Sequence, residues 1–409
     1  LNCLGAREYT KISYPVKYGI FSRLETRDRI MEFDLNHEIR HARGKTDKWL
    51  HPREWLKRTK GNDWIYYSTG GYAGVFESIG EYYLPNLMYP TNSLLGGKPF
   101  NEPEIQKICS EWPQIIGHLP DRMPGMPPWA EQWLGQIKGV SPKALAEKAD
   151  KLFRIPGGRV SVLPPDARHS DYNVIPLNIA DGCQYKCRFC RVKNKKKFSP
   201  RSRSEILDQI NELKSLYGPD LVNFNSLFLG EHDALNAPDD LILFAAGKAC
   251  KEFDFPSSYM RQPRLYLFGS VDALLEKDES FFSGLSRLPF DTFINLGFES
   301  FDQATLDHLG KPLTVAQVRN AFDRAREINR LYGKIEITGN FIMDEALPES
   351  HTRAMLDLVR DNFSHTMPKG CIYLSPLKFS SPSREILYDF YRLKTLSRLP
   401  MFLYIIQRL

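Results

Sequence analysis

The sequence predicts an α/β fold, a partial (βα)6 parallel barrel preceded by an accessory region. From about residue 158 onward, short apolar runs alternate with stretches of helical length and periodicity. All six tryptophans lie earlier, between Trp49 and Trp133, so the first third of the chain differs in composition. We therefore assign residues 1–157 to an aromatic-rich N-terminal accessory region and residues 158–409 to the barrel.

The accessory region contains a basic stretch at 41–58 and an aromatic, glycine-rich stretch at 63–83. A proline-rich segment at 119–128 is interpreted as a linker or wrapping loop. Ser141 followed by Pro142 is typical of a helix start, and the helix is expected to run to about Phe153. The region carries no chemical motif. Its aromatic side chains are expected to form a core rather than to stack on a flat substrate.

The barrel region is expected to contain six strands, at 173–180, 221–229, 264–270, 292–300, 334–343 and 371–379. Helices are expected between and after them, at 205–218, 239–253, 279–288, 315–333, 351–363 and 383–396. Strands that alternate with helices of this length form right-handed β/α units around a parallel sheet. Six units leave a TIM-type barrel open on one side. In such barrels the reactive side chains lie at the C-terminal ends of the strands.

Composition places the chain among ordinary globular proteins, with 42% apolar and 25% charged residues. The formal charge of +6 favours an acidic partner or an anionic substrate, but does not by itself predict nucleic acid. No apolar run approaches the roughly 18 residues that span a bilayer, and the apolar end at 401–409 is expected to pack against the fold. Seven cysteines are an odd number, which argues against a disulfide framework. We expect a reducing, cytoplasmic location.

Three of these cysteines follow the first predicted strand with the spacing Cys183-x3-Cys187-x2-Cys190. Thiolates so close along one tight loop can point at one centre without stretching the backbone. Three thiolates can bind three irons of a cubane iron–sulfur cluster and leave the fourth iron open to another ligand.

This motif, with the aromatic Phe189 directly before its last cysteine, resembles the signature of the radical S-adenosylmethionine (SAM) superfamily. The resemblance covers roughly residues 158–400 and is nearest to methylthiotransferases and oxygen-independent coproporphyrinogen oxidases. It implies a [4Fe–4S] cluster on Cys183, Cys187 and Cys190, with SAM on the open iron. It also implies reductive cleavage of SAM to a 5′-deoxyadenosyl radical, and a place for Phe189 near the adenine.

Further strand ends resemble the SAM-binding segments of the same superfamily. The second strand ends in LFLGEHD, similar to a Gly-Gly-Glu segment that receives the SAM ammonium group, except that Leu229 replaces the first glycine. The third strand ends in FGSVD, the fourth in NLGFES and the fifth in TGNFIMD. The resemblance therefore implies SAM contacts from Gly230, Glu231, Ser270, Glu299, Gly339 and Asn340.

Other interpretations of these residues stay open. His232 supplies a fourth ligand for a structural Cys3His zinc site, and a simple electron-transfer cluster is a second alternative. Glu231 can pair with a surface lysine instead of SAM. Polar residues at strand ends also cap helices. Cys250 and Cys371 are expected to pack in the core.

A basic loop follows the cysteines, with Lys193, Lys195, Lys196, Lys197, Arg201 and Arg203. We interpret it as a solvated loop or as a docking patch for an acidic electron donor such as flavodoxin or ferredoxin, ahead of an RNA contact.

No second cysteine cluster and no cobalamin-binding segment is recognisable. The preferred function is a radical SAM enzyme that abstracts hydrogen from a small organic substrate. The alternatives are a radical SAM enzyme that modifies RNA or another macromolecule, and a non-catalytic zinc or iron–sulfur protein.

Overall fold

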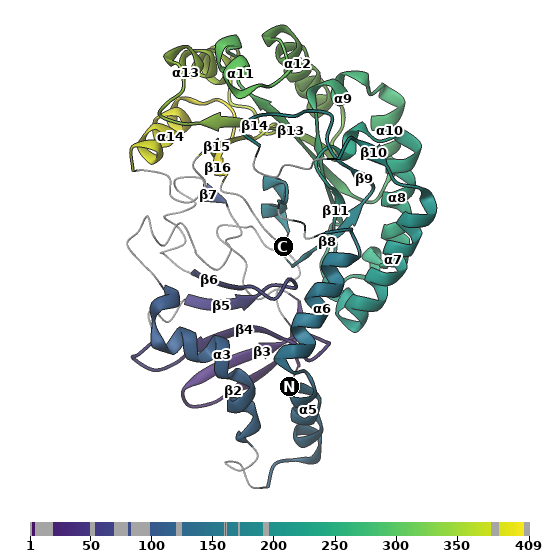
Figure 1. Ribbon diagram of the computed structural model, residues 1–409, viewed down its shortest axis with the longest axis vertical. Coiled ribbons are helices and arrows are strands. Elements are labelled where there is room, and N and C mark those ends of the chain that lie inside the picture. The colour runs from purple at the N-terminus through teal and green to yellow at the C-terminus, as the bar shows by residue number, and fades with distance from the viewer. Residues whose placement is uncertain are drawn as a thin grey trace.

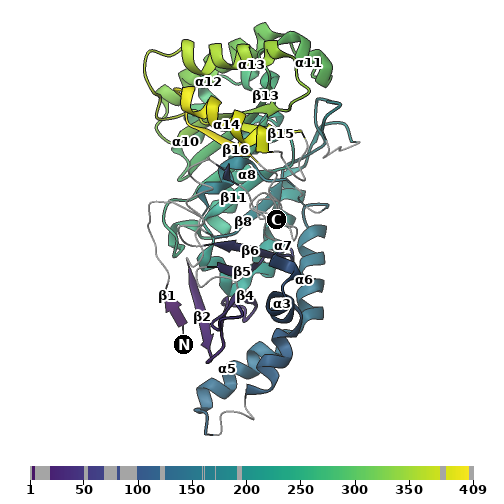
Figure 2. The same cartoon turned by 90° about the vertical axis from the view of Figure 1, so that its left-hand side faces the viewer.

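The computed structural model describes residues 2–4, 19–49, 54–68, 81–82, 99–119, 125–158, 160, 162–170, 172–190, 196–377 and 384–404. Two large β-sheets organise the chain (Figure 1). A six-stranded sheet comes from the N-terminal region, and an eight-stranded sheet forms the barrel. Figure 2 shows the N-terminal sheet toward one end of the molecule and most of the barrel toward the other.

Every pairing in the barrel sheet is parallel. In sheet order its strands are β7 (Glu81–Tyr82), β16 (Met401–Tyr404), β15 (Ile372–Pro376), β14 (Ile335–Met343), β13 (Asp291–Glu299), β12 (Arg264–Gly269), β11 (Ser226–Gly230) and β8 (Val174–Asn178). From β8 to β16 each new strand is added beside the previous one, as consecutive right-handed β/α units require. Among the described strands, β7 and β8 are the two edges, so the barrel is open there.

Helices cover the outer face of this curved sheet (Figure 1). They are α7 (Arg203–Tyr217), α8 (Asp239–Glu252), α9 (Val271–Glu276), α10 (Glu279–Arg287), α11 (Gln303–Leu309), α12 (Val315–Leu331), α13 (Glu349–Leu356) and α14 (Arg384–Leu396). Ser202 and Thr314 begin α7 and α12 with complete capping boxes. The apolar helix faces and the strands share one continuous core. Each fully buried Leu or Ile there contributes roughly 1.5–3 kcal/mol.

The predicted fold class is confirmed, with differences in detail. The second predicted strand is wrong over its first half, because residues Gly218–Asn223 form a 3-10 helix and β11 begins only at Ser226. The predicted helix at 351–363 is α13, which continues into a π-helical turn at Asp357–Asp361. The apolar end of the chain does pack against the fold, but as a further barrel strand, β16.

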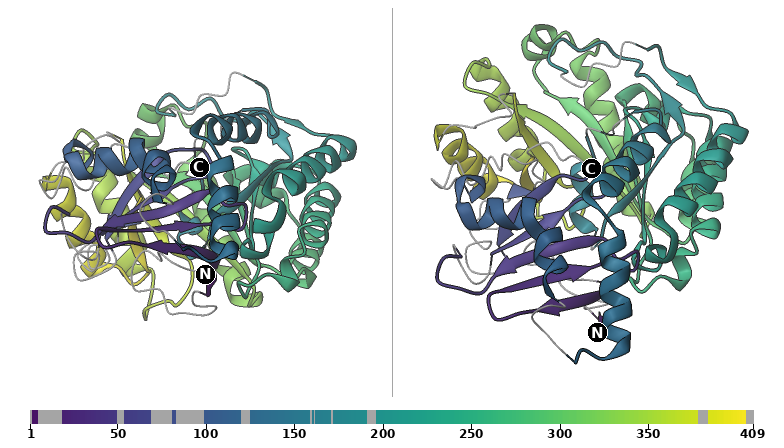
Figure 3. Two further views of the ribbon diagram at one scale, coloured as in Figure 1. Left: turned by 90° about the horizontal axis from the view of Figure 1, so that it is seen from below. Right: turned by 60° about the horizontal axis from the view of Figure 1, so that its bottom comes forward.

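The N-terminal sheet is antiparallel and follows chain order through β1 (Asn2–Leu4), β2 (Ile20–Glu25), β3 (Arg29–Phe33), β4 (Ile39–Gly44), β5 (Glu54–Arg58) and β6 (Trp64–Ser68). Three helices accompany it, α3 (Pro103–Gly117), α5 (Pro128–Gly139) and α6 (Pro142–Arg154). Figure 3 shows these helices in blue beside the purple sheet. The expected cap is present, since Ser141 Oγ accepts a hydrogen bond from the Ala144 amide.

A separate core joins this sheet to its helices and contains Trp49, Trp64 and Trp112. The expectation of an aromatic core therefore holds for these side chains, whereas Trp129 is 52% exposed. Residues 69–80 and 83 of the aromatic stretch, and 120–124 of the proline-rich segment, lie outside the described residues. The division of the chain at residue 157 stays a prediction. The strand β7 comes from before that point and pairs with β16 of the barrel.

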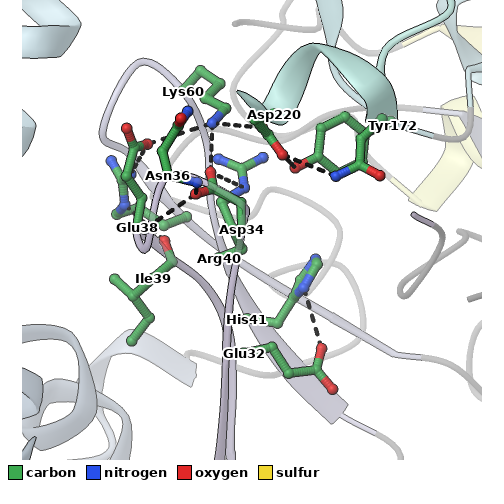
Figure 4. Close-up of polar contacts among 12 residues, drawn as sticks. Glu32, Asp34, Asn36, Glu38, Ile39, Arg40, His41, Lys60, Tyr172 and Asp220 are labelled. Carbon is green, nitrogen blue, oxygen red and sulfur yellow. Dashed lines mark hydrogen bonds and ion pairs between the residues drawn. The ribbon is translucent and has the colours of Figure 1, made fainter. Parts of the chain in front are cut away.

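A group of buried charges, together with the half-buried Tyr172, joins the two sheets. We call Asp34, Glu38, Arg40, Lys60, Tyr172 and Asp220 the junction network (Figure 4). The Lys60 ammonium lies 2.5 Å from Asp34 Oδ2 and 2.9 Å from Asp220 Oδ2. Tyr172 donates to Asp220 as well. Asp220 lies in the 3-10 helix before β11 and Tyr172 lies two residues before β8, so the N-terminal sheet is attached at the amino ends of these strands.

Among the described residues, no helix combines the length and the apolar character that crossing a bilayer requires.

Candidate functional site

A cavity of about 630 Å³ opens at the carboxyl ends of the barrel strands. Its walls come from the loop after β8 and from the residues that end or follow β11, β12, β13, β14 and β15. This is the face on which parallel barrels carry their reactive groups, and a pocket of this size suits a small-molecule ligand.

The loop at 182–190 carries the three cysteines into this cavity. Gly182 begins it with φ +79°, and a side chain there would place its Cβ 2.4 Å from the Lys197 carbonyl oxygen. Only glycine therefore allows the loop to leave β9 (Ala180–Asp181) so close to the returning chain. Cys183, Cys187 and Cys190 all line the cavity and are all partly exposed.

Hydrogen bonds tie this cysteine loop to the helices around it. The Tyr185 hydroxyl donates to Asp272 Oδ2 at 2.7 Å, and Gln184 Nε2 donates to the same oxygen at 3.3 Å. Asp272 belongs to the first turn of α9. The Arg188 amide donates to the carbonyl of Leu309, the last residue of α11, at 2.9 Å. The loop is thus held at three points.

Burial raises the pKa of the Cys187 thiol to about 11, although the nearby Lys311 ammonium lowers it. Burial likewise raises the pKa of Cys183. A thiol binds iron as the thiolate, and a bound cation favours that form. A metal or cluster that binds these cysteines would therefore release protons.

Glu299 and Lys311 form a buried ion pair on the cavity wall, with Lys311 Nζ 3.1 Å from Glu299 Oε1. A register shift between Gly297 and Glu299 ends β13, and Glu299 there has φ +65°. Such a bulge redirects a side chain. Gly297 leaves room for the pair, since a Cβ there would lie 2.5 Å from Glu299 Oε1. Burial lowers the pKa of Lys311, but the Glu299 carboxylate and the Cys187 and Cys183 sulfurs raise it by more, so the ammonium stays charged.

Asp233 presents a buried carboxylate oxygen at the cavity. Its Oδ1 accepts a hydrogen bond from the Ser270 amide at 2.8 Å, while Oδ2 has no hydrogen-bond partner. The residue is 1% exposed, and burial raises its pKa to about 6. At neutral pH it is mostly ionised. Ser270 lines the cavity and also caps α9, because its Oγ accepts from the Ala273 amide.

Asn340 has a similar free acceptor. Its Nδ2 donates to Asn295 Oδ1 at 2.5 Å, and its own Oδ1 has no partner. Buried polar atoms are normally satisfied, so these two unpaired oxygens on residues that line the same cavity indicate a ligand with hydrogen-bond donors. Three thiols and two unpaired acceptors fit an iron–sulfur cluster together with a polar ligand.

A zinc ion and an iron–sulfur cluster place different demands on three cysteines. Within the described part of the chain, no three His, Cys, Asp or Glu side chains gather closely enough to hold one metal ion. A structural zinc ion requires four ligands that converge on a single point. A cubane binds each thiolate through a different iron, so its cysteines are spaced more widely.

The structure brings most of the predicted site residues together. The cavity is lined by Cys183, Cys187, Phe189, Cys190, Ser270, Glu299 and Asn340. Gly230, Glu231 and Gly339 are not among its lining residues. Glu231 Oε2 lies 3.2 Å from His232 Nε2, and the alternative of a surface lysine partner stays a prediction. Gly339 borders a second cavity of about 270 Å³, on the other side of β14.

Sequence reasoning missed Tyr185, Asp233 and Lys311, all of which line the cavity. Asp233 lies two residues beyond Glu231, so the strand end was identified but not the side chain that reaches the cavity. Lys311 follows α11, where no pattern in the sequence indicates a site. Cys250 and Cys371 are buried, as expected. Lys193 and Lys195 of the basic loop lie outside the described residues.

Comparison with known proteins gives one family match. Residues 177–350 match the model of the radical SAM superfamily. Among curated proteins, none matches the chain at a significant level.

Several solved structures are distantly similar. OxsB, a cobalamin-dependent S-adenosylmethionine radical enzyme, is 17% identical with a TM-score of 0.35, over 45% of this chain and 26% of its own. The part of OxsB that matches this chain is therefore about a quarter of its length. A radical SAM methyltransferase from Sphaerobacter thermophilus is 14% identical with a TM-score of 0.37, over 58% of this chain and 67% of its own. SuiB from Streptococcus suis is 10% identical with a TM-score of 0.38, over 87% of this chain and 71% of its own.

The matched residues run from the end of β8 to the start of α13, and they include the cysteine loop and most of the cavity wall. The region that holds the cysteine loop is therefore similar to the radical SAM superfamily, over less than half of the chain.

Proposed function

We propose that Cys183, Cys187 and Cys190 hold the [4Fe–4S] cluster, and that the cavity beside them binds SAM and a small organic substrate. The observation that carries this proposal is that all three cysteines line one cavity at the carboxyl ends of the strands. When bound, the cluster supplies the electron that cleaves SAM into a hydrogen-abstracting 5′-deoxyadenosyl radical.

Charge on the cavity wall suggests how SAM is oriented. Asp233 offers an unpaired carboxylate oxygen, which suits the SAM ammonium group better than Glu231, whose carboxylate pairs with His232. The Lys311 ammonium suits the SAM carboxylate and is itself held by Glu299. Phe189, Ser270 and Asn340 line the same cavity and can contact the adenosyl part.

The size and lining of the cavity favour a small substrate. A volume of about 630 Å³ is typical of pockets for one drug-sized ligand, and here the cofactors share it. Away from the cysteine loop, the described wall includes the apolar residues Val162, Phe268, Ile342, Pro376 and Leu377, together with Ser375 and Tyr404. Apolar walls with a few polar groups shield a radical from water and side reactions.

Modification of RNA is less well supported. In the described part of the basic loop, Lys196 and Arg201 pair with Asp181, and Arg203 pairs with Asp240. Their charge is thus partly used within the chain. Lys186 and Arg188 are exposed at the cysteine loop beside the cavity. We propose that an acidic flavodoxin or ferredoxin docks at this edge, where positive charge speeds association. The reducing, cytoplasmic location expected from the cysteines belongs to this proposal.

Anaerobic reconstitution of the wild-type protein and of Cys187→Ala tests the assignment. The wild type is expected to hold close to four irons and four sulfides and to form 5′-deoxyadenosine with a reductant, about one cubane per chain. Cys187→Ala should lose both properties while its circular dichroism is unchanged. Cys250→Ala is the matched control, because Cys250 is buried in α8 away from the cavity and should retain both. Cleavage of SAM by Cys187→Ala, or a wild-type protein that holds only zinc, refutes the proposal.

A further inference from the structure

A chain of side-chain hydrogen bonds crosses the barrel interior and ends at Asn340 on the cavity wall. It begins at Arg168 and Asp166 in a 3-10 turn (Pro165–His169) that precedes β8. Arg168 Nε donates to the Tyr373 hydroxyl at 2.8 Å, and that hydroxyl donates to Asp166 Oδ1 at 2.8 Å. None of these three residues lines the cavity.

The second half of the chain approaches Asp166 from the cavity. Thr338 Oγ1 donates to Asp166 Oδ2 at 2.7 Å, and Asn295 Nδ2 donates to Thr338 Oγ1 at 2.8 Å. Asn340 Nδ2 then donates to Asn295 Oδ1 at 2.5 Å. Asp166, Thr338 and Asn295 are at most 1% exposed, so these links are shielded from bulk water.

The direction of every link follows from the chemistry of the two ends. An ionised carboxylate only accepts hydrogen bonds, and an arginine only donates them. Burial raises the pKa of Asp166 to about 6, so at neutral pH it is mostly ionised. Thr338 must therefore donate to Asp166 and accept from Asn295. Since Asn295 Nδ2 donates to Thr338, Asn295 Oδ1 is the atom that accepts a hydrogen bond from Asn340.

The last amide is thereby oriented. With its Nδ2 committed to Asn295, Asn340 presents Oδ1, the atom that has no partner within the protein. We propose that Asp166, a residue outside the cavity, is a positioning residue for cofactor binding: through Thr338 and Asn295 it holds Asn340 Oδ1 as an acceptor for a hydroxyl or amino group of the adenosyl part of SAM. The inference rests on the proposed binding of SAM in this cavity.

Asp166→Asn tests this because it reverses the chain with almost no change in shape. Arg168 still donates to the Tyr373 hydroxyl oxygen, so the Tyr373 hydroxyl still donates its hydrogen to residue 166. The amide oxygen of the new asparagine accepts that hydrogen, and its NH2 group therefore faces Thr338. Thr338 then donates to a flipped Asn295, and Asn340 flips to present Nδ2 to the cavity. A donor would then face a donor. We expect the dissociation constant of SAM to rise by roughly 10- to 100-fold.

A second substitution should repair the first. Asn295→Asp places an acceptor-only group one link nearer the cavity, where it accepts from both Thr338 and Asn340. In the Asp166→Asn background it should restore the affinity for SAM to within roughly threefold of the wild type, less than the effect of one hydrogen bond. A merely structural role of Asp166 would leave the double variant as weak as the single one, or weaker.

The experiment measures SAM binding by equilibrium dialysis on anaerobically reconstituted protein, with iron content and melting temperature recorded for each variant. Ser170→Ala is the control, because Ser170 is buried beside the same turn but bonds to Tyr266 outside the chain. Its affinity should match the wild type. If Asp166→Asn does not fold, Thr338→Val interrupts the same chain by removing one hydroxyl, and it should also weaken binding.

Weakened binding in Asp166→Asn with recovery in the double variant supports the inference. Unchanged affinity in Asp166→Asn or in Thr338→Val, or no recovery in the double variant, overturns it. A wild-type protein that holds its cluster but does not bind SAM overturns the proposed function, and this inference with it.

Discussion

Lys60→Met is expected to destabilise the protein strongly by breaking the junction network. The Lys60 side chain is 7% exposed and contacts Asp34, Glu38 and Asp220, whose side chains are at most 4% exposed. Burial lowers the pKa of Lys60, but these carboxylates raise it by more than burial lowers it, so the ammonium is charged in the folded protein. Methionine retains the apolar stem of the side chain and removes only the charge.

The magnitude follows from the carboxylates that are left behind. Removing one partner of a buried ion pair costs about 3–5 kcal/mol, because the other charge stays buried without compensation. Here two oxygens lose an ammonium at 2.5 and 2.9 Å. Neighbouring Arg40 reaches Asp34 only at 3.9 Å, so it cannot replace the lost contact fully. We therefore expect a loss of about 3–5 kcal/mol, a large share of the 5–15 kcal/mol of a typical domain.

Urea unfolding measures this loss. Tryptophan fluorescence reports on the N-terminal region, which holds all six tryptophans, while far-UV circular dichroism reports on the whole chain. Lys143→Met is the matched control, because the Lys143 side chain is 86% exposed beside an exposed Glu147 and its loss should cost less than about 1 kcal/mol. If Lys60→Met were destabilised no more than this control, the network would not attach the sheet to the barrel.

Three further predictions concern charge and the cysteine loop. Glu38 is buried, which raises its pKa, but Lys60, Lys148 and Arg58 lower it to about 2. Its folded pKa thus lies below the unfolded value of about 4.3, so it contributes stability above that pH which is lost as the pH falls toward 2. Glu38→Gln should flatten the acid side of a stability profile measured by urea unfolding, and an unchanged slope would contradict this. Asp233→Asn should weaken SAM binding roughly tenfold and Glu231→Gln by much less, measured by equilibrium dialysis; the reverse order would restore Glu231 as the ammonium contact. Asp272→Ala releases Tyr185 and Gln184, and should speed the loss of iron to a chelator several-fold without moving the melting temperature more than the capping variant Asp278→Ala does. Equal rates of iron loss from Asp272→Ala and the wild type would show that these bonds do not hold the loop.

Much of the barrel is predictable because parallel strands are buried on both faces and therefore form continuous apolar runs. The strand predicted at 221–229 was wrong at its start for a specific reason. The side chain of Asn223 bonds to the backbone of Ile20, and that of Asn225 bonds to the backbone of Arg261 and Gln262. Such side-chain contacts compete with strand pairing, and their partners are distant in sequence.

The N-terminal sheet could not be predicted from apolar periodicity. In β4 (Ile39–Gly44) both Arg40 and His41 are buried, although their sequence pattern suggests a solvated strand. Arg40 is buried beside an acid from another segment, Asp34, whose Oδ2 lies 3.9 Å from Arg40 Nε. The same limit applies at the candidate site. The cysteine spacing is local and visible, whereas Lys311 reaches the cavity only through the tertiary fold.

The pairing of β7 with β16 has a practical consequence for attempts to isolate the barrel. A fragment that begins near residue 158 would lack β7 and would leave the hydrogen-bonding groups of β16 open to other molecules. It would also lack Lys60, so Asp220 would lose the ammonium group that pairs with it. Uncovered strand edges promote aggregation. Crystallisation or spectroscopy of such a fragment is therefore better attempted with the preceding segment retained, even though that segment carries none of the cysteines of the motif.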